Sequence, residues 1–163
     1  MSKFLLIGPS GIGKSTALKN VIQDTAIDVF DLDDLIKEDV DVTSISTYFG
    51  NVGSEIFFNQ SKLSIEKIDR EKDVLIAVGA GSIDFEGGHK WYQTQNTIAL
   101  TGNADIIYDR SERKKFHPTI DSYKHREFSP VRQSLYSRSK YIIDVTELTP
   151  KEVAHKILEI IKN

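Results

Sequence analysis

Cysteine is absent from the 163 residues of the chain, and its absence excludes three kinds of chemistry. A disulfide framework, a thiolate zinc site and a thiol nucleophile all require it. Long apolar runs are missing too, since no segment approaches the length that spans a bilayer. Residues 1–3 lead directly into the first expected strand and leave no room for a signal peptide. We therefore expect a cytoplasmic protein without a membrane partner.

An excess of charge of one sign is also missing. The formal net charge is −3, which argues weakly against sequence-independent binding to nucleic acid. At 163 residues we expect a single domain, residues 1–163, that acts as a monomer with one site. The charge is uneven, however: residues 110–140 carry a net +6 and the remainder carries −9. Concentrated cations suit an anionic ligand such as a triphosphate, although a solvated helix surface accounts for some of them.

A glycine-rich segment near the start fits the phosphate-binding pattern G-x-x-x-x-G-K-[ST], with Gly8, Gly13, Lys14 and Ser15 at the fixed positions. Residues 4–7 before it form an apolar run typical of a buried strand, and the apolar spacing of residues 17–22 after it predicts a helix. The alternative is a glycine turn that only joins a strand to a helix. The flanking elements favour the nucleotide-binding interpretation.

The residue types of this segment explain how it would bind a nucleoside triphosphate. Glycines allow a tight turn whose amide N–H groups wrap the phosphates, and the helix that follows adds its positive end. Lys14 supplies charge to the outer phosphates, and the Ser15 hydroxyl can ligate Mg²⁺. The residues that we expect to bind the nucleotide here are Gly8, Ser10, Gly11, Ile12, Gly13, Lys14, Ser15 and Thr16.

Three carboxylates follow the second expected strand, residues 28–30. Ligands of open α/β sheets bind beyond the carboxyl ends of the strands, where the phosphate loop also lies. Asp31 could therefore hold Mg²⁺ through water, and Asp33 could orient or deprotonate an acceptor hydroxyl. For Asp34 we weigh an equal alternative, which is capping of the next helix.

Further strands are expected at residues 74–78, 97–100 and 141–143, separated by helices, which indicates the α/β class. The long helical stretch of residues 44–71 is interrupted near residues 50–53. Expected core contacts include Ile56, Phe57, Leu63 and Ile106. The strand at 74–78 exits into Gly79-Ala80-Gly81, which is either a simple turn or a place where a ligand approaches the backbone. Residues 114–125 are basic, and we expect a mobile lid there. Its His117 and His125 are more simply solvated loop residues than metal ligands.

Taken together, the chain resembles the shikimate kinase family of small P-loop kinases from about Lys3 to the C-terminus. Five segments carry the resemblance: GPSGIGKST at 8–16, FDLDDLI at 30–36, residues 53–62, VLIAVGAG at 74–81, and Arg132-x-x-x-Tyr136. The resemblance implies a three-layer P-loop NTPase fold with a five-stranded parallel sheet in the order 2-3-1-4-5. It also implies ATP as phosphoryl donor, Mg²⁺, and a small-molecule acceptor.

The resemblance assigns further roles. Asp31 would lie in the magnesium shell, Asp33 would bind the acceptor hydroxyls, and Arg132 would grip a carboxylate of the acceptor. Gly79, Ala80 and Gly81 would line the acceptor pocket. Arg110 would lie near the adenine, and Arg113 is the cation expected to reach the transferring phosphate.

The chain departs from the family on the acceptor side. Phe58 or Asn59 stands where the family has an arginine that clamps the shikimate carboxylate, and Lys62, one turn on, is an inferior substitute. Ala80 replaces a glycine, and His117 replaces a lid arginine. The sequence therefore leaves the acceptor open. We hold two hypotheses: a kinase that phosphorylates a small-molecule hydroxyl, and a nucleotide-binding sensor or partner-binding module that has lost catalysis.

Overall fold

The computed structural model describes residues 1–111 and 117–163. Its strands are β1 (Lys3–Ile7), β2 (Ile27–Asp31), β3 (Asp73–Ala77), β4 (Asn96–Thr101) and β5 (Tyr141–Asp144). Its α-helices are α1 (Lys14–Val21), α2 (Leu32–Val40), α3 (Ile45–Glu66), α4 (His89–Gln93), α5 (Ala104–Arg110), α6 (Ile120–Glu127), α7 (Pro130–Ser137) and α8 (Pro150–Lys162). Two short 3₁₀ turns, η1 (Ala80–Ile83) and η2 (Glu86–Gly88), follow β3.

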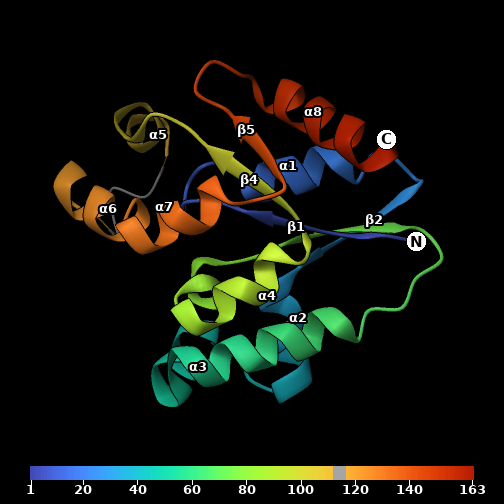
Figure 1. The fold of residues 1–163 in the computed structure, drawn as a ribbon, viewed down its shortest axis with the longest axis horizontal. Coiled ribbons are helices and arrows are strands. Elements are labelled where there is room, and N and C mark those ends of the chain that lie inside the picture. The colour runs from blue at the N-terminus through green and yellow to red at the C-terminus, as the bar shows by residue number, and fades with distance from the viewer. Residues whose placement is uncertain (112–116) are drawn as a thin grey trace.

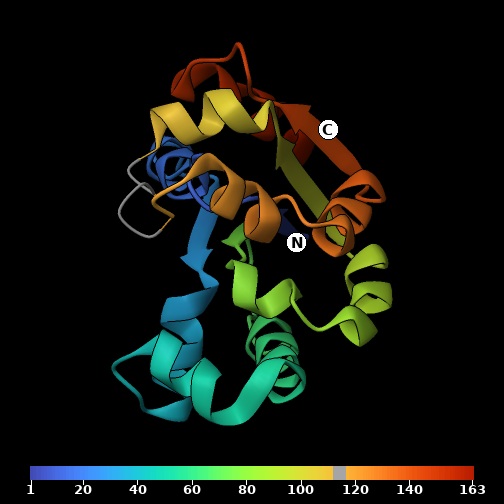
Figure 2. The same cartoon turned by 90° about the vertical axis from the view of Figure 1, so that its left-hand side faces the viewer.

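The strands form one parallel sheet in the order β2-β3-β1-β4-β5, which confirms the expected topology (Figure 1). In register, Leu5 of β1 pairs with Ile76 of β3 and with Thr97 of β4. Because every strand runs in the same direction, all carboxyl ends meet at one edge of the sheet. Figure 2 looks at the side of the molecule where α5, α6 and α7 gather.

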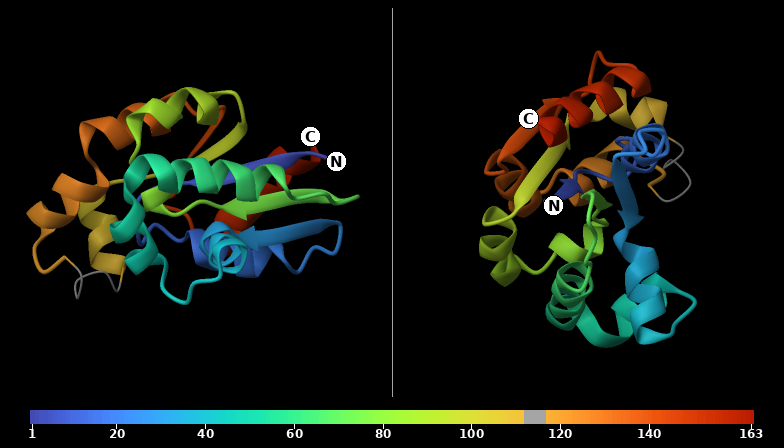
Figure 3. Two further views of the ribbon diagram at one scale, coloured as in Figure 1. Left: turned by 90° about the horizontal axis from the view of Figure 1, so that it is seen from below. Right: turned by 90° about the vertical axis from the view of Figure 1, so that its right-hand side faces the viewer.

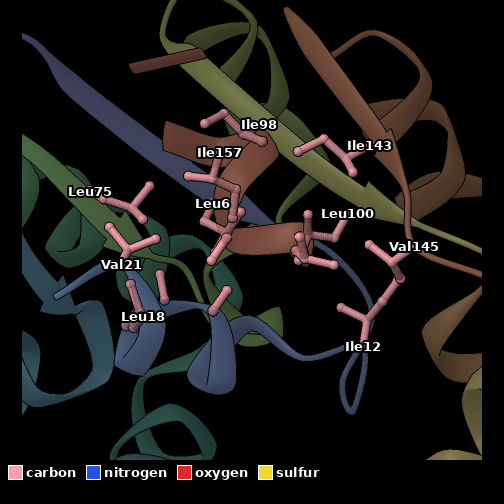
Figure 4. Close-up of a cluster of buried hydrophobic side chains, with 14 of the residues drawn as sticks. Leu6, Ile12, Leu18, Val21, Leu75, Ile98, Leu100, Ile143, Val145 and Ile157 are labelled. Carbon is pink, nitrogen blue, oxygen red and sulfur yellow. The ribbon is translucent and has the colours of Figure 1, made fainter. Parts of the chain in front are cut away.

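Alternation along the strands divides the interior into two apolar layers. Leu6 of β1 and Leu100 of β4 pack toward α1 and α8, in the cluster drawn in Figure 4. Leu5 and Ile7 of β1 point the other way, into a second cluster with α2, α3, α4 and α7. The central strands are thus buried on both faces, as expected for a parallel sheet covered by helices. Figure 3 shows α3 lying along one face and α6 and α7 beyond one end of the strands.

Helix α3 contains the expected interruption. Gly53 has a φ of 84° and a ψ of 172°, a backbone conformation that side chains with a Cβ rarely adopt. Beyond the break, Phe57 and Phe58 are buried, whereas Ile56 and Leu63 are 54% and 56% exposed. The expectation that Ile56 and Leu63 belong to the core was therefore wrong.

The last helix begins as its sequence indicates. The hydroxyl of Thr149 accepts a hydrogen bond from the Glu152 amide, and the Glu152 carboxylate accepts one from the Thr149 amide, which is a capping box. Among residues 1–111 and 117–163, no helix combines the length and apolar character needed to cross a membrane.

Candidate active site

The phosphate loop joins β1 to α1 at the carboxyl edge of the sheet. Gly13 caps α1 with a φ of 110°, so the chain turns sharply and presents the first amides of the helix to the space above the sheet. Lys14 Nζ donates hydrogen bonds to the carbonyl oxygens of Gly8, at 2.6 Å, and Pro9, at 3.0 Å. These contacts hold the ammonium group over the loop, where a polyphosphate would bind.

The carboxylates after β2 have separate roles. Asp31 is the last residue of β2 and caps α2, because its Oδ1 accepts a hydrogen bond of 2.9 Å from the Asp33 amide. Asp34, which we considered as the capping residue, is instead exposed and forms an ion pair of 3.2 Å with Lys37. The cap fixes the first turn of α2 and thereby the position of Asp33.

Asp33 is the most perturbed carboxylate at this edge of the sheet. Burial, followed by the charges of Asp31 and Asp34, raises its pKa from 3.8 to about 6, and Lys37 and Lys14 oppose the shift. Within the described residues no donor is hydrogen bonded to its side chain, which lies against the exit of β3. A Cβ added to Gly79 would lie 3.0 Å from Asp33 Oδ1. A carboxyl group with this pKa can exchange a proton near neutral pH.

A cavity of about 1100 Å³ opens where the phosphate loop, the end of β2 and the exit of β3 meet. It brings together most of the residues expected to form the site. The expected residues that line it are Ser10, Gly11, Gly13, Lys14, Ser15, Thr16, Asp31, Asp33, Gly79, Ala80, Gly81, Arg110 and Arg132. Gly8 and Ile12 shape the loop from beneath: Ile12 is buried in the core, and a Cβ on Gly8 would lie 2.7 Å from the Leu100 carbonyl oxygen.

Phe58 and Asn59, which we expected on the acceptor side, do not line this cavity. The ring of Phe58 packs among Phe85, Trp91 and Tyr92, with centroid distances of 5.7 to 6.0 Å, and Asn59 is exposed. Their neighbour Phe57 lines the cavity instead. Lys62 lies outside the wall as well, with its Nζ 6.0 Å from the Trp91 ring.

Arg132 lies in the wall, but two carboxylates already bind it. Its Nη1 donates to both carboxylate oxygens of Glu127 at 3.0 and 2.8 Å, and its Nε and Nη2 donate to Asp84 Oδ1 at 3.0 and 2.7 Å. Burial disfavours the guanidinium charge, but the fields of Glu127 and Asp84 outweigh it, and the pKa of Arg132 is raised. The Tyr136 hydroxyl is buried nearby, without a hydrogen-bond partner among the described residues.

The region expected to form a lid is helical in its second half. Residues 120–125 lie in α6, whose Tyr123 is buried and donates a hydrogen bond of 2.6 Å to the Ser10 carbonyl oxygen of the phosphate loop. His117 and Arg126 line the cavity. Residues 114–116 of the expected lid, and the candidate catalytic residue Arg113, lie outside the described residues.

Arg110, expected near the adenine, lies at the rim of the cavity. Its guanidinium donates to the carbonyl oxygens of Val145 and Thr146, which fixes the side chain over the loop after β5. The sequence did not single out Asp84, Glu127 or Arg126. The net positive charge of residues 110–140 indicated that the segment containing Arg126 and Glu127 could bind an anion, but it did not indicate which side chains line the cavity.

The residues present fit a magnesium ion bound together with a nucleotide. Ser15 and Asp31 both line the cavity next to the phosphate loop, so the Ser15 hydroxyl and the Asp31 carboxylate are the protein oxygens that could ligate the ion. Mg²⁺ in such sites needs only one or two protein oxygens, because phosphates and waters supply the others. The described residues contain no cluster of three or more His, Cys, Asp or Glu side chains that could hold a metal ion.

Known proteins resemble this chain over nearly its whole length. The family model described as shikimate kinase matches residues 10–162. A shikimate kinase of Thermodesulfovibrio yellowstonii is 27% identical over 98% of this chain and 94% of its own, and one of Staphylococcus aureus is 29% identical over 99% and 94%.

Solved structures share the fold. A shikimate kinase of Bacteroides thetaiotaomicron superposes with a TM-score of 0.75 at 20% identity, covering 99% of both chains. One of Acinetobacter baumannii, solved in complex with shikimate, gives 0.72 at 19% identity and covers 99% of this chain and 93% of its own. The match of the family model over nearly the whole sequence shows that the chain belongs to the shikimate kinase family of P-loop kinases.

Proposed function

We propose that the protein is an ATP- and Mg²⁺-dependent kinase that phosphorylates a hydroxyl group of a small metabolite. One observation carries the proposal: Lys14 and Ser15 of the phosphate loop share a single cavity with Asp33. Phosphoryl transfer depends mainly on positioning and on neutralising charge, so donor and acceptor must meet in one enclosure.

In the proposed reaction the acceptor oxygen forms a bond to the γ-phosphorus while the bond from that phosphorus to the β–γ bridging oxygen breaks. Asp33 orients the acceptor hydroxyl and accepts its proton, which then passes to solvent. Lys14 turns from the Gly8 and Pro9 carbonyl groups to the outer phosphates, and the amides of the loop bind the remaining oxygens. The products are ADP and the phosphate ester.

Other groups of the wall neutralise charge. Ser15 and Asp31 would hold the magnesium ion, which stabilises negative charge on the phosphates when it is bound. Arg126 follows Tyr123 by three residues on α6, and residues at this spacing are neighbours on a helix surface. Because Tyr123 contacts the phosphate loop, we assign Arg126 to the triphosphate as well. Arg113 remains a second candidate for this role.

The test is acceptor-dependent formation of ADP by the wild-type protein and by Lys14→Ala. We expect turnover to be abolished in Lys14→Ala, because charge neutralisation at the outer phosphates is lost. Lys19→Ala is a matched control, since Lys19 is on the same helix, is exposed and lies outside the cavity wall. If no candidate metabolite accelerates ADP formation over the basal rate, the protein is a sensor or binding module and the proposal is wrong.

A further inference from the structure

The charges around Arg132 bear on the kind of acceptor that the cavity can hold. Its hydrogen bonds to Glu127 and Asp84 occupy most of the donors of a guanidinium group. The Arg132 side chain is 5% exposed and that of Glu127 is 3% exposed, so solvent screens this group little. Two carboxylates and one guanidinium give the cluster a net charge of −1. An acceptor carboxylate would have to compete with carboxylates that are already bound.

One carboxylate oxygen of Asp84, at the side of the cavity lined by Arg132, is an unused hydrogen-bond acceptor. Arg132 binds only its Oδ1, and its Oδ2 has no hydrogen-bond partner among the described residues. The side chain is 27% exposed and lines the cavity. A carboxylate oxygen in this position is satisfied by a donor on the ligand, and most strongly by a charged donor.

Two aromatic rings also line the cavity, next to the Gly79-Ala80-Gly81 segment. Phe49 and Phe57 line the cavity in an edge-to-face pair with centroids 5.1 Å apart. Both rings lie against Gly81, since a Cβ on that residue would be 3.1 Å from Phe49 and 3.5 Å from Phe57. Aromatic faces attract cations and offer a carboxylate no hydrogen-bond donor. This observation is independent of the ion-pair cluster and favours the same sign of charge on the ligand.

We propose that the acceptor is a hydroxyl compound that carries an ammonium group and no carboxylate, with the ammonium group bound by Asp84 beside Phe49 and Phe57. The proposal rests on the proposed function and names the substrate class of the same site. Asp84 is then a specificity-determining residue, and the Asp84–Arg132–Glu127 cluster excludes acidic acceptors by repulsion.

The first experiment measures the affinities of three cyclic acceptors for the wild-type protein saturated with Mg²⁺ and ADP, by titration calorimetry. The three probes are cyclic hydroxyl compounds that differ mainly in charge. An aminodeoxyinositol carries an ammonium group, myo-inositol carries only hydroxyls, and shikimate carries a carboxylate. We expect the amine to bind roughly ten- to a hundredfold more tightly than shikimate, the factor of one charge-assisted hydrogen bond. Tightest binding of shikimate or of myo-inositol, or no binding of the amine, would overturn the proposal.

The second experiment repeats the titrations with Asp84→Asn. The change keeps the shape of the side chain, removes one negative charge and loosens the hold on Arg132. The preference for the amine over shikimate should fall by the same roughly ten- to a hundredfold. Glu86→Gln is the matched control, because it removes the same charge two residues away at an exposed position outside the cavity wall. An equal loss in both variants would contradict a specific role of Asp84.

Binding and turnover separate the two proposals. ADP formation tests whether the protein is a kinase, and the order of affinities tests which charge the acceptor carries. If the amine binds tightest and nothing is phosphorylated, the kinase proposal fails and the ligand class stands. If shikimate binds tightest and is phosphorylated, the kinase proposal stands and the proposed ligand class fails.

Discussion

Replacing Asp33 by Asn should stabilise the protein while it removes phosphoryl transfer. The folded state raises the pKa of Asp33 from 3.8 to about 6, mainly through burial. Above pH 6 the carboxylate is ionised in a site that favours its neutral form, so it destabilises the fold. Because a pKa change of one corresponds to about 1.4 kcal/mol, the rise from 3.8 to about 6 lowers the free energy of unfolding by at most about 3 kcal/mol. The Asp33 side chain is partly exposed, which reduces this cost to about 2 to 3 kcal/mol.

The sign of the pH dependence follows from proton binding. Between pH 3.8 and about 6 the folded protein binds more protons at Asp33 than the unfolded chain does, so the cost appears as the pH rises through this window. Asn resembles the neutral acid and carries no such cost. The difference between variant and wild type should therefore be about 2 to 3 kcal/mol near pH 8 and below about 1 kcal/mol near pH 4.

Urea unfolding of both proteins at about pH 8 and about pH 4 measures this difference, and melting near pH 8 should shift upward by roughly 4 to 12 °C. ATP should still bind, because the phosphate loop is unchanged. Asp34→Asn is the control. Asp34 is exposed and paired with Lys37, so this variant should differ from wild type in its free energy of unfolding by about 0.5 kcal/mol or less. If Asp33→Asn is no more stable than wild type near pH 8, or its advantage does not shrink with falling pH, the burial argument is wrong.

Two further predictions follow from the charged groups of the site. With saturating ATP, kcat/KM for the acceptor should rise with pH through about 6 and then level off, because Asp33 must be ionised to accept a proton; a flat profile from about pH 5 to about pH 7 would exclude this role. Glu127→Ala should lower the free energy of unfolding in urea by about 3 to 5 kcal/mol, because it leaves a buried Arg132 charge partly unpaired. Asp105→Ala, the control, breaks an exposed ion pair with Lys124 and should lower the free energy of unfolding by about 1 kcal/mol or less. Equal losses of stability in the two variants would contradict the larger contribution of the buried ion pair.

The sequence correctly predicted those features of the fold and the cavity that depend on residues close together in the chain. The phosphate loop, the carboxylates after β2 and the capping box at Thr149 are recognisable because their residues lie within a few positions of one another. The order of the strands came from the resemblance to a family rather than from the residues. Short-range signals and a known topology together located most of the cavity wall.

The sequence predictions were wrong or incomplete where the position of a residue depends on the direction of its side chain or on contacts between distant parts of the chain. Ile56 and Leu63 were expected inside but are exposed, because the buried face of this part of α3 carries Phe57, Phe58, Ser61, Ser64 and Ile65, two of which are polar serines. Ile106 was likewise expected inside and is 39% exposed, whereas its neighbour Ile107 is buried. No pattern in the sequence shows that Asp84 meets Arg132, because 48 positions separate them. Such contacts become visible only once the sheet has placed the loops side by side.

Helix α6 contacts both halves of the cavity within one turn. Tyr123 is hydrogen bonded to the phosphate loop, and Glu127, four residues on, is paired with Arg132 on the acceptor side. A displacement of α6 by either substrate would act on the contacts of the other, so the two affinities would be thermodynamically linked. By reciprocity, the factor by which nucleotide changes acceptor affinity must equal the factor by which acceptor changes nucleotide affinity. A short helix between the two sites would thus make their occupancy cooperative.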